Sequence, residues 1–595
     1  MGFTKSNLPT SSSPSTSSPK RRPIILGLFF LLTSSFIFFL TDTFPRAQLI
    51  DVIHLQAQSV ASFRPPNKVK PPSWFEAIHE DHLAYQRPMR VGMVNIENTG
   101  VQLLEHSLKG FIDSVVAIDF EPVSPNVTWK KLFPEWIHED RRGRCPRIPM
   151  PEPGKYLGLD MVVAQLPCRE LESEKIANNN NNNNKTTGAK EGIRDVQRLQ
   201  VSLATASLIV ENEAKGENDV YAVFIGKCEP MVEIFRCDDL VWHEGEYWVY
   251  KPNVERLRES ISMPVGTCAL VHPYDAAPGT MQLQANPNQL HEQLQITKPS
   301  AKNNQRPRHA YVTLLHSSEA YVCGAIALAQ SIRQTNSTKD LVLLADNSIS
   351  DHSILGLQAA GWKVKRIERI RSPHARINAY NEWNYSKLRV WQLTDYDKVM
   401  FIDADFIVLH NIDHFFNYPQ LSASPNNNWL FNSGIMILEP SKCFFDTLMS
   451  KRYTLKSYNG GDQGYLNEVL TWWHRLTTRL NFMKFFPKKE SDRSIPEDRH
   501  TIHFLGMKPW TCYRDYDCNW DRADYHRYAS DDVNARWWQV YDGMSTELQA
   551  HCGMTQEMDR RVRKGREIAQ KATIFDEHWK IAIKDPRQFQ LVSSV

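Results

Sequence analysis

The stretch 399–410 constrains the fold most, because it sets two acidic residues between two apolar runs. Residues 399–402 predict a buried strand, and a second apolar run follows at 406–409. Asp403 and Asp405 lie between them. In extended backbone, positions i and i+2 point to the same side, so both carboxylates can aim at one point. Oxygen ligands suit a hard divalent cation, whereas an isolated Asp-x-Asp more often caps a turn.

Alternating strands and helices surround this stretch. Apolar runs predict strands at 310–315, 341–345 and 362–367, and helical patterns occupy 321–334, 350–360 and 386–394. This order predicts an α/β fold with a mainly parallel, doubly wound sheet. Ligands bind beyond the carboxyl ends of such strands, which is where Asp403 and Asp405 fall. No Gly-x-Gly-x-x-Gly follows the first strand and no phosphate-binding Gly-Lys-Ser/Thr occurs, which disfavours dinucleotide and NTPase sites.

Three motifs further along offer what a metal-bound diphosphate site requires. Residues 432–434 (Asn-Ser-Gly) lie between apolar runs and offer a short polar side chain and a glycine that allows close approach. Residues 459–464 (Asn-Gly-Gly-Asp-Gln-Gly) place a carboxylate and an amide in a Gly-rich turn that opens a helix over 465–473. Each alone is more often turn chemistry than a site. His503 supplies an imidazole as a third metal ligand, and Lys508, five residues on, supplies a charge for phosphate. A single His would more often be structural, but beside Asp-x-Asp we favour the ligand.

The N-terminal 41 residues predict a membrane anchor. Residues 1–22 form a Ser/Pro/Thr-rich cytosolic tail that ends in Lys-Arg-Arg, and an 18-residue uncharged run follows at 23–40. A cleaved signal peptide is disfavoured, because the run is long and no Ala-x-Ala follows it. The basic residues before the run predict a cytosolic N-terminus and a lumenal remainder. The formal charge of +3 offers no electrostatic case for nucleic acid.

Composition and apolar patterning predict the domain order. Apolar runs alternate with a helical pattern in the first folded region, which predicts a second α/β domain, and a polyasparagine tract at 178–184 is interpreted as a loop insertion. The predicted ranges are tail 1–22, transmembrane signal anchor 23–41, stem 42–87, N-terminal α/β domain 88–275, linker 276–307, catalytic domain 308–530 and C-terminal extension 531–595.

Cysteines and glycosylation sequons agree with a lumenal location. Ten cysteines without a Cys-x-x-Cys pair disfavour zinc and permit disulfides, with Cys512 and Cys518 as candidate partners. Sixteen tryptophans are candidates for polysaccharide platforms, although many buried tryptophans belong to cores. The sequons begin at Asn126, Asn184, Asn336 and Asn384. The platform candidates include Trp472, Trp473, Trp510, Trp520, Trp537 and Trp538.

The motifs, taken in order over residues 308–530, resemble those of family 8 glycosyltransferases, the glycogenin-like group. They are Thr313-Leu314, Tyr321, Tyr385-Ser-Lys387-Leu, Asp403-Ala-Asp405, Phe431-Asn-Ser-Gly434, Gly461-Asp-Gln-Gly464 and His503-Phe-x-Gly-x-Lys508-Pro-Trp510. The anchor and segments at 192–200, 223–226 and 233–240 further resemble the plant xylan α-glucuronosyltransferases. The residues themselves suggest no chemical role for these three segments.

The resemblance implies a GT-A fold and a Golgi membrane enzyme that transfers glucuronate from UDP-glucuronate to xylan with retention of configuration. It implies Mn²⁺, with Mg²⁺ as the alternative, held by Asp403, Asp405 and His503. Asp462 and Lys387 are the implied catalytic residues. The implied donor-binding residues are Leu314, Tyr321, Lys387, Asp403, Ala404, Asp405, Asn432, Ser433, Gly434, Asn459, Gly460, Gly461, Asp462, Gln463, His503, Phe504, Leu505, Gly506, Met507 and Lys508.

Two alternatives remain open on the sequence. The motifs bind the nucleotide and the metal and do not determine the donor sugar. UDP-glucose, UDP-galactose or UDP-galacturonate can therefore serve as donor to another acceptor. The chain can also act as a non-catalytic scaffold in a Golgi complex, which the intact set of three metal ligands disfavours. Whether retention uses a covalent intermediate or front-face attack is likewise open, because no carboxylate is an obvious nucleophile.

Overall fold

The computed structural model describes residues 71–82, 88–141, 143–168, 194–215, 219–272, 307–427, 429–487 and 493–589. The predicted tail, anchor, most of the stem, the polyasparagine tract and nearly all of the linker lie outside these ranges. Within the described ranges, no helix combines the length and apolar character that a membrane span requires.

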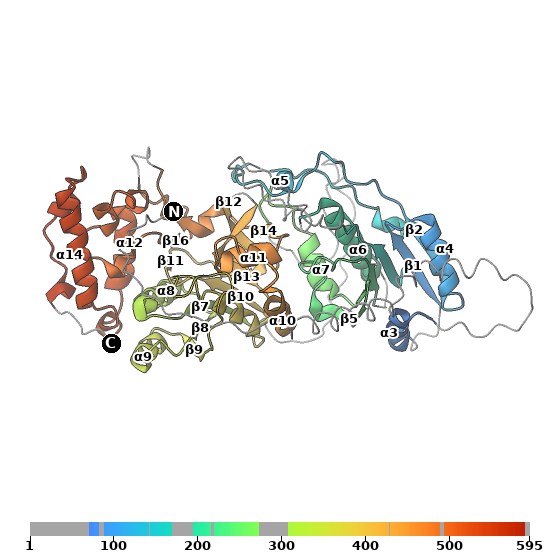
Figure 1. The fold of residues 1–595 in the computed structure, drawn as a ribbon, viewed down its shortest axis with the longest axis horizontal. Coiled ribbons are helices and arrows are strands. Elements are labelled where there is room, and N and C mark those ends of the chain that lie inside the picture. The colour runs from blue at the N-terminus through green and yellow to red at the C-terminus, as the bar shows by residue number, and fades with distance from the viewer. Residues whose placement is uncertain are drawn as a thin grey trace, which may run out of the picture. The chain divides into compact units, whose positions relative to one another are not determined.

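The N-terminal part of the chain forms a six-stranded sheet in the order β2-β1-β3-β4-β6-β5 (Figure 1). The first four strands in this order are parallel, as expected for the second α/β domain that the apolar runs predicted. A short antiparallel hairpin then extends the sheet. The strands are β1 (Met89–Val94), β2 (Ile112–Ile118), β3 (Met161–Gln165), β4 (Tyr221–Ile225), β5 (Leu240–Glu244) and β6 (Tyr247–Tyr250).

Helices cover both faces of this sheet. The long helix α6 packs on one face, where Ala204, Ala206 and Leu208 are buried. The short helix α3 packs on the other face through Phe75 and Ile78, so folded structure begins before the predicted boundary at residue 88. The helices are α3 (Ser73–His82), α4 (Asn98–Ser107), α5 (Trp129–Leu132), α6 (Val196–Lys215) and α7 (Val254–Ile261).

The second sheet has seven strands in the order β14-β12-β13-β10-β7-β8-β9. Strands β10, β7, β8 and β9 are parallel, as the alternating pattern predicted. Strand β13 runs antiparallel to both of its neighbours, so the sheet is mixed. The strands are β7 (His309–Leu315), β8 (Asp340–Ala345), β9 (Lys363–Arg366), β10 (Lys398–Ile402), β12 (Ser422–Asn427), β13 (Leu430–Leu438) and β14 (His474–Arg475).

The helices around the second sheet mostly match the predicted ranges. The segment predicted as a helix at 386–394 is the 3-10 helix η6. Helix α11 begins at Asp462 and ends before the predicted end at 473, because Glu233 accepts the backbone N–H groups of Thr471 and Trp472 and draws them out of the helical ladder. These elements are η5 (Glu319–Tyr321), α8 (Val322–Gln334), α9 (Asp351–Ala359), η6 (Tyr385–Gln392), α10 (Lys442–Lys451) and α11 (Asp462–Val469).

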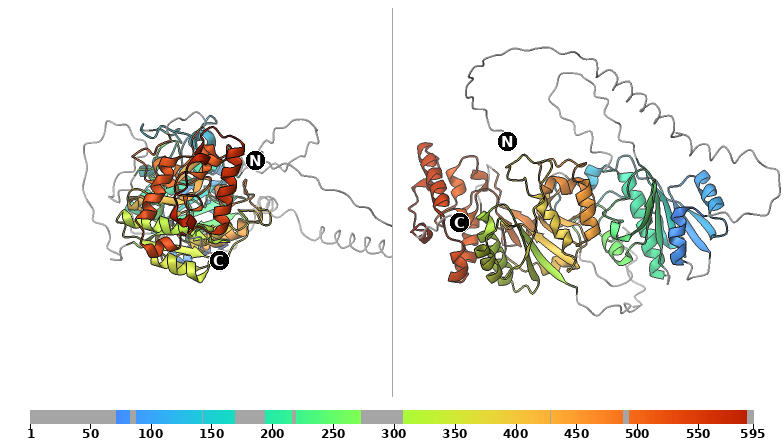
Figure 2. Two further views of the ribbon diagram at one scale, coloured as in Figure 1. Left: turned by 90° about the vertical axis from the view of Figure 1, so that its left-hand side faces the viewer. Right: turned by 60° about the horizontal axis from the view of Figure 1, so that its bottom comes forward.

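A small three-stranded sheet and a helical C-terminal part complete this region (Figure 2). The small sheet has the order β11-β16-β15 and carries part of the candidate site. A disulfide between Cys323 in α8 and Cys552 ties the C-terminal part to the seven-stranded sheet. The remaining elements are β11 (Phe406–Val408), β15 (Phe482–Met483), β16 (Thr501–His503), α12 (Asp531–Asp542), α13 (Thr546–Ala550) and α14 (Gln556–Lys571).

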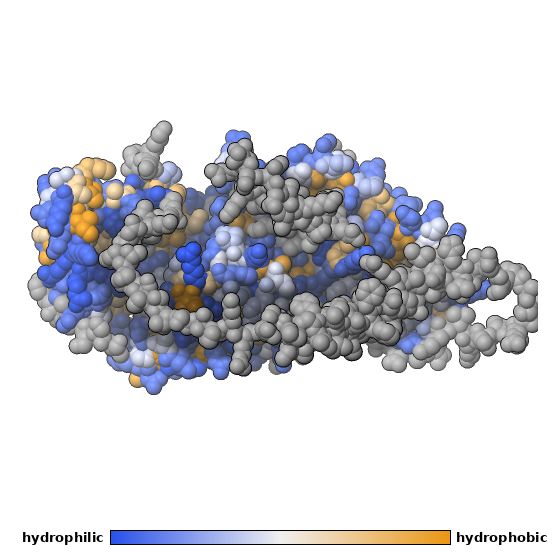
Figure 3. Space-filling view, in the orientation of Figure 1, coloured by the Kyte–Doolittle hydropathy of each residue, from blue (hydrophilic) through white to orange (hydrophobic). Residues whose placement is uncertain are grey.

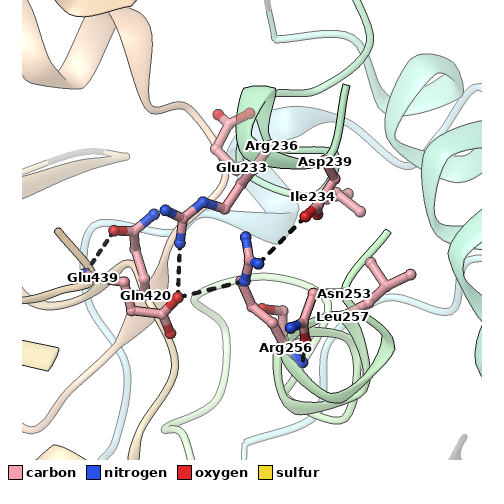
Figure 4. Close-up of a pocket in the computed structure, with 10 residues that line it drawn as sticks. Glu233, Ile234, Arg236, Asp239, Asn253, Arg256, Leu257, Gln420 and Glu439 are labelled. Atoms are coloured by element: carbon pink, nitrogen blue, oxygen red, sulfur yellow. Dashed lines mark hydrogen bonds and ion pairs between the residues drawn. The ribbon is translucent and has the colours of Figure 1, made fainter. Parts of the chain in front are cut away.

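One hydrophobic cluster runs from the first sheet to the second. It includes Val162 and Phe224 of the N-terminal sheet and Val312 and Phe401 of the other. Next to this cluster, a small pocket of about 10 Å³ lies among charged side chains from both parts (Figure 4). The pocket is lined by Glu233, Ile234, Arg236, Asp239, Asn253, Arg256, Leu257, Ser260, Gln420 and Glu439, none of which belongs to the predicted site.

All ten cysteines are paired, and the two candidate partners Cys512 and Cys518 are bonded to each other. One bridge, Cys237 to Cys443, joins the N-terminal part to α10. The remaining bridges are Cys145–Cys268, Cys168–Cys228 and Cys323–Cys552.

Five of the six tryptophans considered as platform candidates are core residues, as many tryptophans are. Trp472, Trp473, Trp510, Trp537 and Trp538 are buried in hydrophobic clusters, and Trp520 is half-buried against His578. The five buried rings fill the core with their apolar area, so they leave no flat face for a ligand. On the face shown in Figure 3, hydrophilic residues prevail over the described elements and hydrophobic ones form small patches.

Candidate active site

The two acidic residues of the Asp-x-Asp motif lie in a tight turn between β10 and β11. The turn is closed by a hydrogen bond from the Phe406 backbone N–H to the Asp403 carbonyl. The extended backbone expected at Asp403 and Asp405 is therefore wrong, although both carboxylates still reach one site. The backbone N–H of Asp403 donates to the carbonyl of Gly434 at 2.9 Å, which fixes the start of the turn against β13.

The pairing of β11 with β16 brings His503 to the same place. Phe406 is opposite His503 in this antiparallel pair, and their rings stack with centroids 4.1 Å apart. One ligand atom from each of Asp403, Asp405 and His503 lies within 4.8 Å of the others. Two carboxylates and a neutral imidazole fit a divalent cation such as Mn²⁺.

His503 is held in the form that a metal ligand requires. Burial lowers the pKa of His503 to about 4, so the ring is neutral at physiological pH. Its Nδ1 lies 3.2 Å from Oδ1 of Asn481, an oxygen that can only accept a hydrogen bond. The proton therefore belongs on Nδ1, and Nε2, which lies 3.5 Å from Asp405, keeps its lone pair for a metal.

Lys508 pairs with the other carboxylate oxygen of Asp405. Its Nζ is 2.7 Å from Oδ2 of Asp405 and also donates to the Phe504 carbonyl. Burial opposes the charge on Asp405, but Lys508 and His503 outweigh it and lower the pKa of that carboxyl. Lys508 is thus a fixed positive charge at the edge of the site, suited to phosphate oxygens.

Lys387 lies on the other side of the site, among three oxygen-bearing residues. Its Nζ is 2.6 Å from Oδ2 of Asp462, 3.2 Å from Oδ1 of Asp403 and 3.1 Å from the Ser433 carbonyl. Burial opposes this charge, but Asp403 and Asp462 outweigh it and raise the pKa of Lys387. Burial, together with Asp405 and Asp462, raises the pKa of Asp403 to about 7 despite Lys387. The site therefore holds three carboxylates and two ammonium groups around the candidate metal position.

Comparisons with known proteins agree with this geometry. The family model "Glycosyl transferase family 8" matches residues 312–513, and the model "GUX1-5 N-terminal domain" matches residues 67–268. UDP-glucuronate:xylan alpha-glucuronosyltransferase 2 of Arabidopsis thaliana is 43% identical over 91% of this chain and 87% of its own length. The chain belongs to glycosyl transferase family 8.

Two further relatives mark the range of the similarity. UDP-glucuronate:xylan alpha-glucuronosyltransferase 1 of Arabidopsis thaliana is 42% identical over 84% of this chain and 72% of its own length. Human glycogenin-1 is 30% identical over 39% of this chain and 71% of its own length. The fold is the GT-A-like fold of glycosyltransferases, with mixed α/β sheets, and the chain is an enzyme of this family.

The structure brings several predicted donor-binding residues of this family 8 enzyme next to the metal site. Tyr321 lies beside Lys508, whose Nζ is 5.9 Å from the centre of the tyrosine ring. Gly434 lies where a Cβ would come within 3.2 Å of Asp403 and 3.0 Å of His503, so only glycine leaves this space open. Gly506 has a φ of +77°, which lets the loop turn back toward Lys508.

Other predicted donor residues shape the loops around the site. Asn432 accepts from the Gly434 backbone N–H, and Asn459 accepts from the N–H of Gly461. Gln463 accepts from the N–H of Ser433 at 3.2 Å. The remaining predicted residues are Leu314 in the last part of β7, Ala404 in the turn, Gly460 in the loop before α11, and Phe504, Leu505 and Met507 in the loop before Lys508.

Three asparagines support the site without having been predicted from the sequence. Asn481 orients His503, and Asn384 donates to Oδ1 of Asp462 at 3.4 Å. Asn519 holds the Lys508 loop by accepting from the N–H of Met507 and donating to its carbonyl. Asn481 and Asn519 lie in short 3-10 helices and Asn384 directly precedes η6, and no periodic pattern marks any of the three as functional. Asn384 also begins a glycosylation sequon, and its hydrogen bond to Asp462 makes it a poor glycosylation site.

The N-terminal part supports the site through α11 and the strands beside it. Arg194 donates from Nη2 to the Asn467 carbonyl at 2.7 Å and pairs with Glu468. Asn467 in turn accepts from the N–H of Phe431 and donates to its carbonyl, two residues before Ser433 in β13. The segment 192–200, which carried no derivable role in the sequence, thus fixes the two elements that present Asp462 and Ser433.

Proposed function

We propose that this enzyme transfers glucuronic acid from UDP-glucuronate to the xylose backbone of xylan. The observation that carries the proposal is the similarity, over 87% of its length, to an Arabidopsis thaliana protein named for that reaction. The three metal-ligand candidates and two lysines around one point support it, because a UDP-sugar presents a diphosphate that needs positive charge.

The site residues fall into a metal-binding group and a phosphate-binding group. Asp403, Asp405 and His503 would hold Mn²⁺, which when bound supplies charge to stabilise the departing UDP. Lys508 and Lys387 would release part of their pairing with carboxylates and turn to the phosphate oxygens. Burial of both lysines excludes water and strengthens each of these interactions.

Asp462 is positioned to orient Lys387 during transfer with retention. Both of its oxygens are engaged: Oδ2 accepts from Lys387 at 2.6 Å and from Ser433 at 2.8 Å, and Oδ1 accepts from Asn384. Its place at the first residue of α11 further favours the ionised form. These contacts favour front-face transfer, with Asp462 as a positioning group rather than the nucleophile.

We propose further that the enzyme is a single-pass type II protein of the Golgi membrane, with its catalytic part in the lumen. Five disulfides require an oxidising compartment such as the secretory pathway. The uncharged run at 23–40 would supply the anchor. Protease protection in intact microsomes, with and without detergent, tests this orientation.

Transfer assays with the full chain test the activity. Detergent-permeabilised microsomes that contain it are given Mn²⁺, xylohexaose and one of UDP-glucuronate, UDP-glucose, UDP-galactose or UDP-galacturonate. We expect product from UDP-glucuronate alone, and loss of product with EDTA that Mn²⁺ restores. Product from another donor would retain the fold and the metal site but overturn the assigned donor. Absence of product with every donor would favour another acceptor or a scaffold role.

A further inference from the structure

Two surface loops beside the Lys387–Asp462 pair carry a concentration of exposed tyrosines. The first loop, 371–384, leads into η6, and the second, 452–461, leads into α11. We call them the platform loops. Their exposed large side chains are Ile377 (74% exposed), Tyr380 (88%), Tyr453 (66%) and Tyr458 (45%).

The two platform loops are held to each other by side-chain hydrogen bonds. Asn381 donates from Nδ2 to the carbonyl of Asn459 at 2.7 Å, and Ser372 donates from Oγ to the carbonyl of Gly460 at 2.7 Å. Gly460 has a φ of +71°, and a Cβ there would come within 3.0 Å of Asn381. The loops therefore form one ordered surface.

The tyrosines occupy adjacent places on this surface. Tyr380 directly precedes Asn381, and Tyr458 directly precedes Asn459, so the hydrogen bond between the two asparagines brings the tyrosine backbones near each other. An exposed aromatic ring on ordered backbone loses little further entropy on binding, because tyrosine has only two side-chain torsions to fix. Exposed apolar groups that gather on one ordered surface mark an interaction site.

A short chain of hydrogen bonds connects Tyr458 to the candidate active site. Gln463 donates from Nε2 to the Tyr458 hydroxyl at 2.8 Å, and its Oε1 accepts from the N–H of Ser433. Ser433 donates to Asp462, the partner of Lys387. The platform loops thus continue directly from the residues that would hold the donor sugar.

We propose that the platform loops bind the polysaccharide acceptor, with Tyr380 and Tyr458 stacking on successive xylose rings. The proposal rests on the proposed function for the identity of the acceptor. A xylose ring has apolar C–H faces and no charge, so flat rings with hydroxyl groups match it better than ion pairs do. The occupant is therefore a neutral xylose chain that enters over Tyr380 and Tyr458 and presents one hydroxyl to the donor.

Kinetics of the full-length enzyme test the proposal. In Tyr380→Ala/Tyr458→Ala we expect the KM for xylohexaose to rise by about 10-fold or more, while the KM for UDP-glucuronate stays within about 2-fold. Tyr380→Phe/Tyr458→Phe keeps both rings, so we expect it to retain most of the acceptor affinity. Phe575→Ala, at a ring that is 82% exposed in the C-terminal part, is the matched control and should leave both constants unchanged.

Affinity electrophoresis separates this proposal from the proposed function. The full chain and its variants migrate through gels that contain soluble xylan, without any donor. If xylan retards the native protein but not the double alanine variant, the result supports acceptor binding by the platform loops, even if no transfer occurs. An unchanged KM for xylohexaose in an active double alanine variant overturns it, as does a native protein that xylan does not retard. Loss of donor affinity together with acceptor affinity also overturns it, because it indicates a structural role.

Discussion

Arg236 and Glu439 form an ion pair with a distance of 2.7 Å from Nη1 to Oε2, although 203 residues separate them in the sequence (Figure 4). Arg236 lies in the N-terminal part and Glu439 directly follows β13. Beside them, Cys237 forms a disulfide with Cys443. The segment 233–240 therefore fastens the N-terminal part to the strand that carries Ser433 and Gly434.

Arg236→Ala should destabilise the protein strongly. Removing one partner of a buried ion pair leaves a desolvated charge and costs about 3–5 kcal/mol. We expect a value toward the lower end, because Arg256 and Lys398 lie 3.7 and 3.9 Å from Glu439 and partly compensate. Thermal unfolding of the full chain measures the effect. Lys155→Ala, which breaks an exposed ion pair with Glu152, should leave the midpoint of thermal unfolding unchanged. An equal fall of the midpoint in both variants would contradict the stabilising role of the Arg236–Glu439 pair.

Asp405→Asn should abolish most transfer while the fold is retained. The variant loses a charged metal ligand and the partner of Lys508, so we expect kcat to fall by about 100-fold or more. Circular dichroism checks the fold and isothermal titration with Mn²⁺ checks binding. Asp395→Asn, at an exposed carboxylate, is the control and should keep native activity and affinity. Native transfer by Asp405→Asn would show that the metal assignment is wrong.

Much of the candidate site could be predicted, since its residues stand in short motifs with defined chemistry. Asp403, Asp405 and His503 follow from carboxylates and an imidazole placed after apolar runs, and the structure brings them together. The expected extended backbone at Asp403 and Asp405 was wrong, because these residues lie in a turn. Sequence could not reveal that β13 runs antiparallel, since a buried strand has the same apolar pattern in either direction.

The parts that could not be predicted depend on contacts between distant segments. Asn481 reaches His503 across 22 residues, and Glu233 reaches Thr471 across 238 residues. Neither pairing leaves a periodic signal. Trp472 was considered for a ligand platform because composition gives the number of tryptophans and not their burial, which the hydrophobic cluster decides.

Mn²⁺ affinity should rise with pH up to about 7 and then level off. In the metal-free protein the pKa of Asp403 is raised to about 7, so below that value a proton must leave before the carboxylate can bind metal. We expect the Kd to weaken by about 10-fold for each pH unit below 7, with proton release visible in titrations in different buffers. His503, with a pKa of about 4, does not titrate in this range. A Kd that is constant from pH 5.5 to 7 would contradict this reading.

Asn481→Ala should weaken metal binding without removing a ligand. The Asn481 side chain fixes the ring orientation and tautomer of His503, and loss of such a partner costs about 10–100-fold in metal affinity. Asn481→Asp keeps an accepting oxygen and should restore most of the affinity. Asn411→Ala, at an exposed amide remote from His503, serves as the control. Equal Mn²⁺ affinity in Asn481→Ala and the native enzyme would exclude this role.

His578 should stabilise the C-terminal part only while it is protonated. Its Nε2 lies 2.8 Å from Asp531 and its Nδ1 lies 3.0 Å from Asp576, so the doubly protonated ring bonds both carboxylates. Burial opposes this charge, but the two carboxylates outweigh it and raise the pKa of His578 above 6.5. A raised folded-state pKa means that the stabilisation is complete below the unfolded value of about 6.5 and is lost as the pH rises through the folded value.

The comparison of His578→Gln with the native chain isolates this contribution. We expect the native protein to unfold at a higher temperature than the variant at pH 5.5, and the gap to narrow as the pH rises toward 9. A gap that widens with pH would mean that neutral His578 is the stabilising form, and a constant gap would assign its effect to the stacking on Trp520 alone, where the ring centres lie 4.6 Å apart.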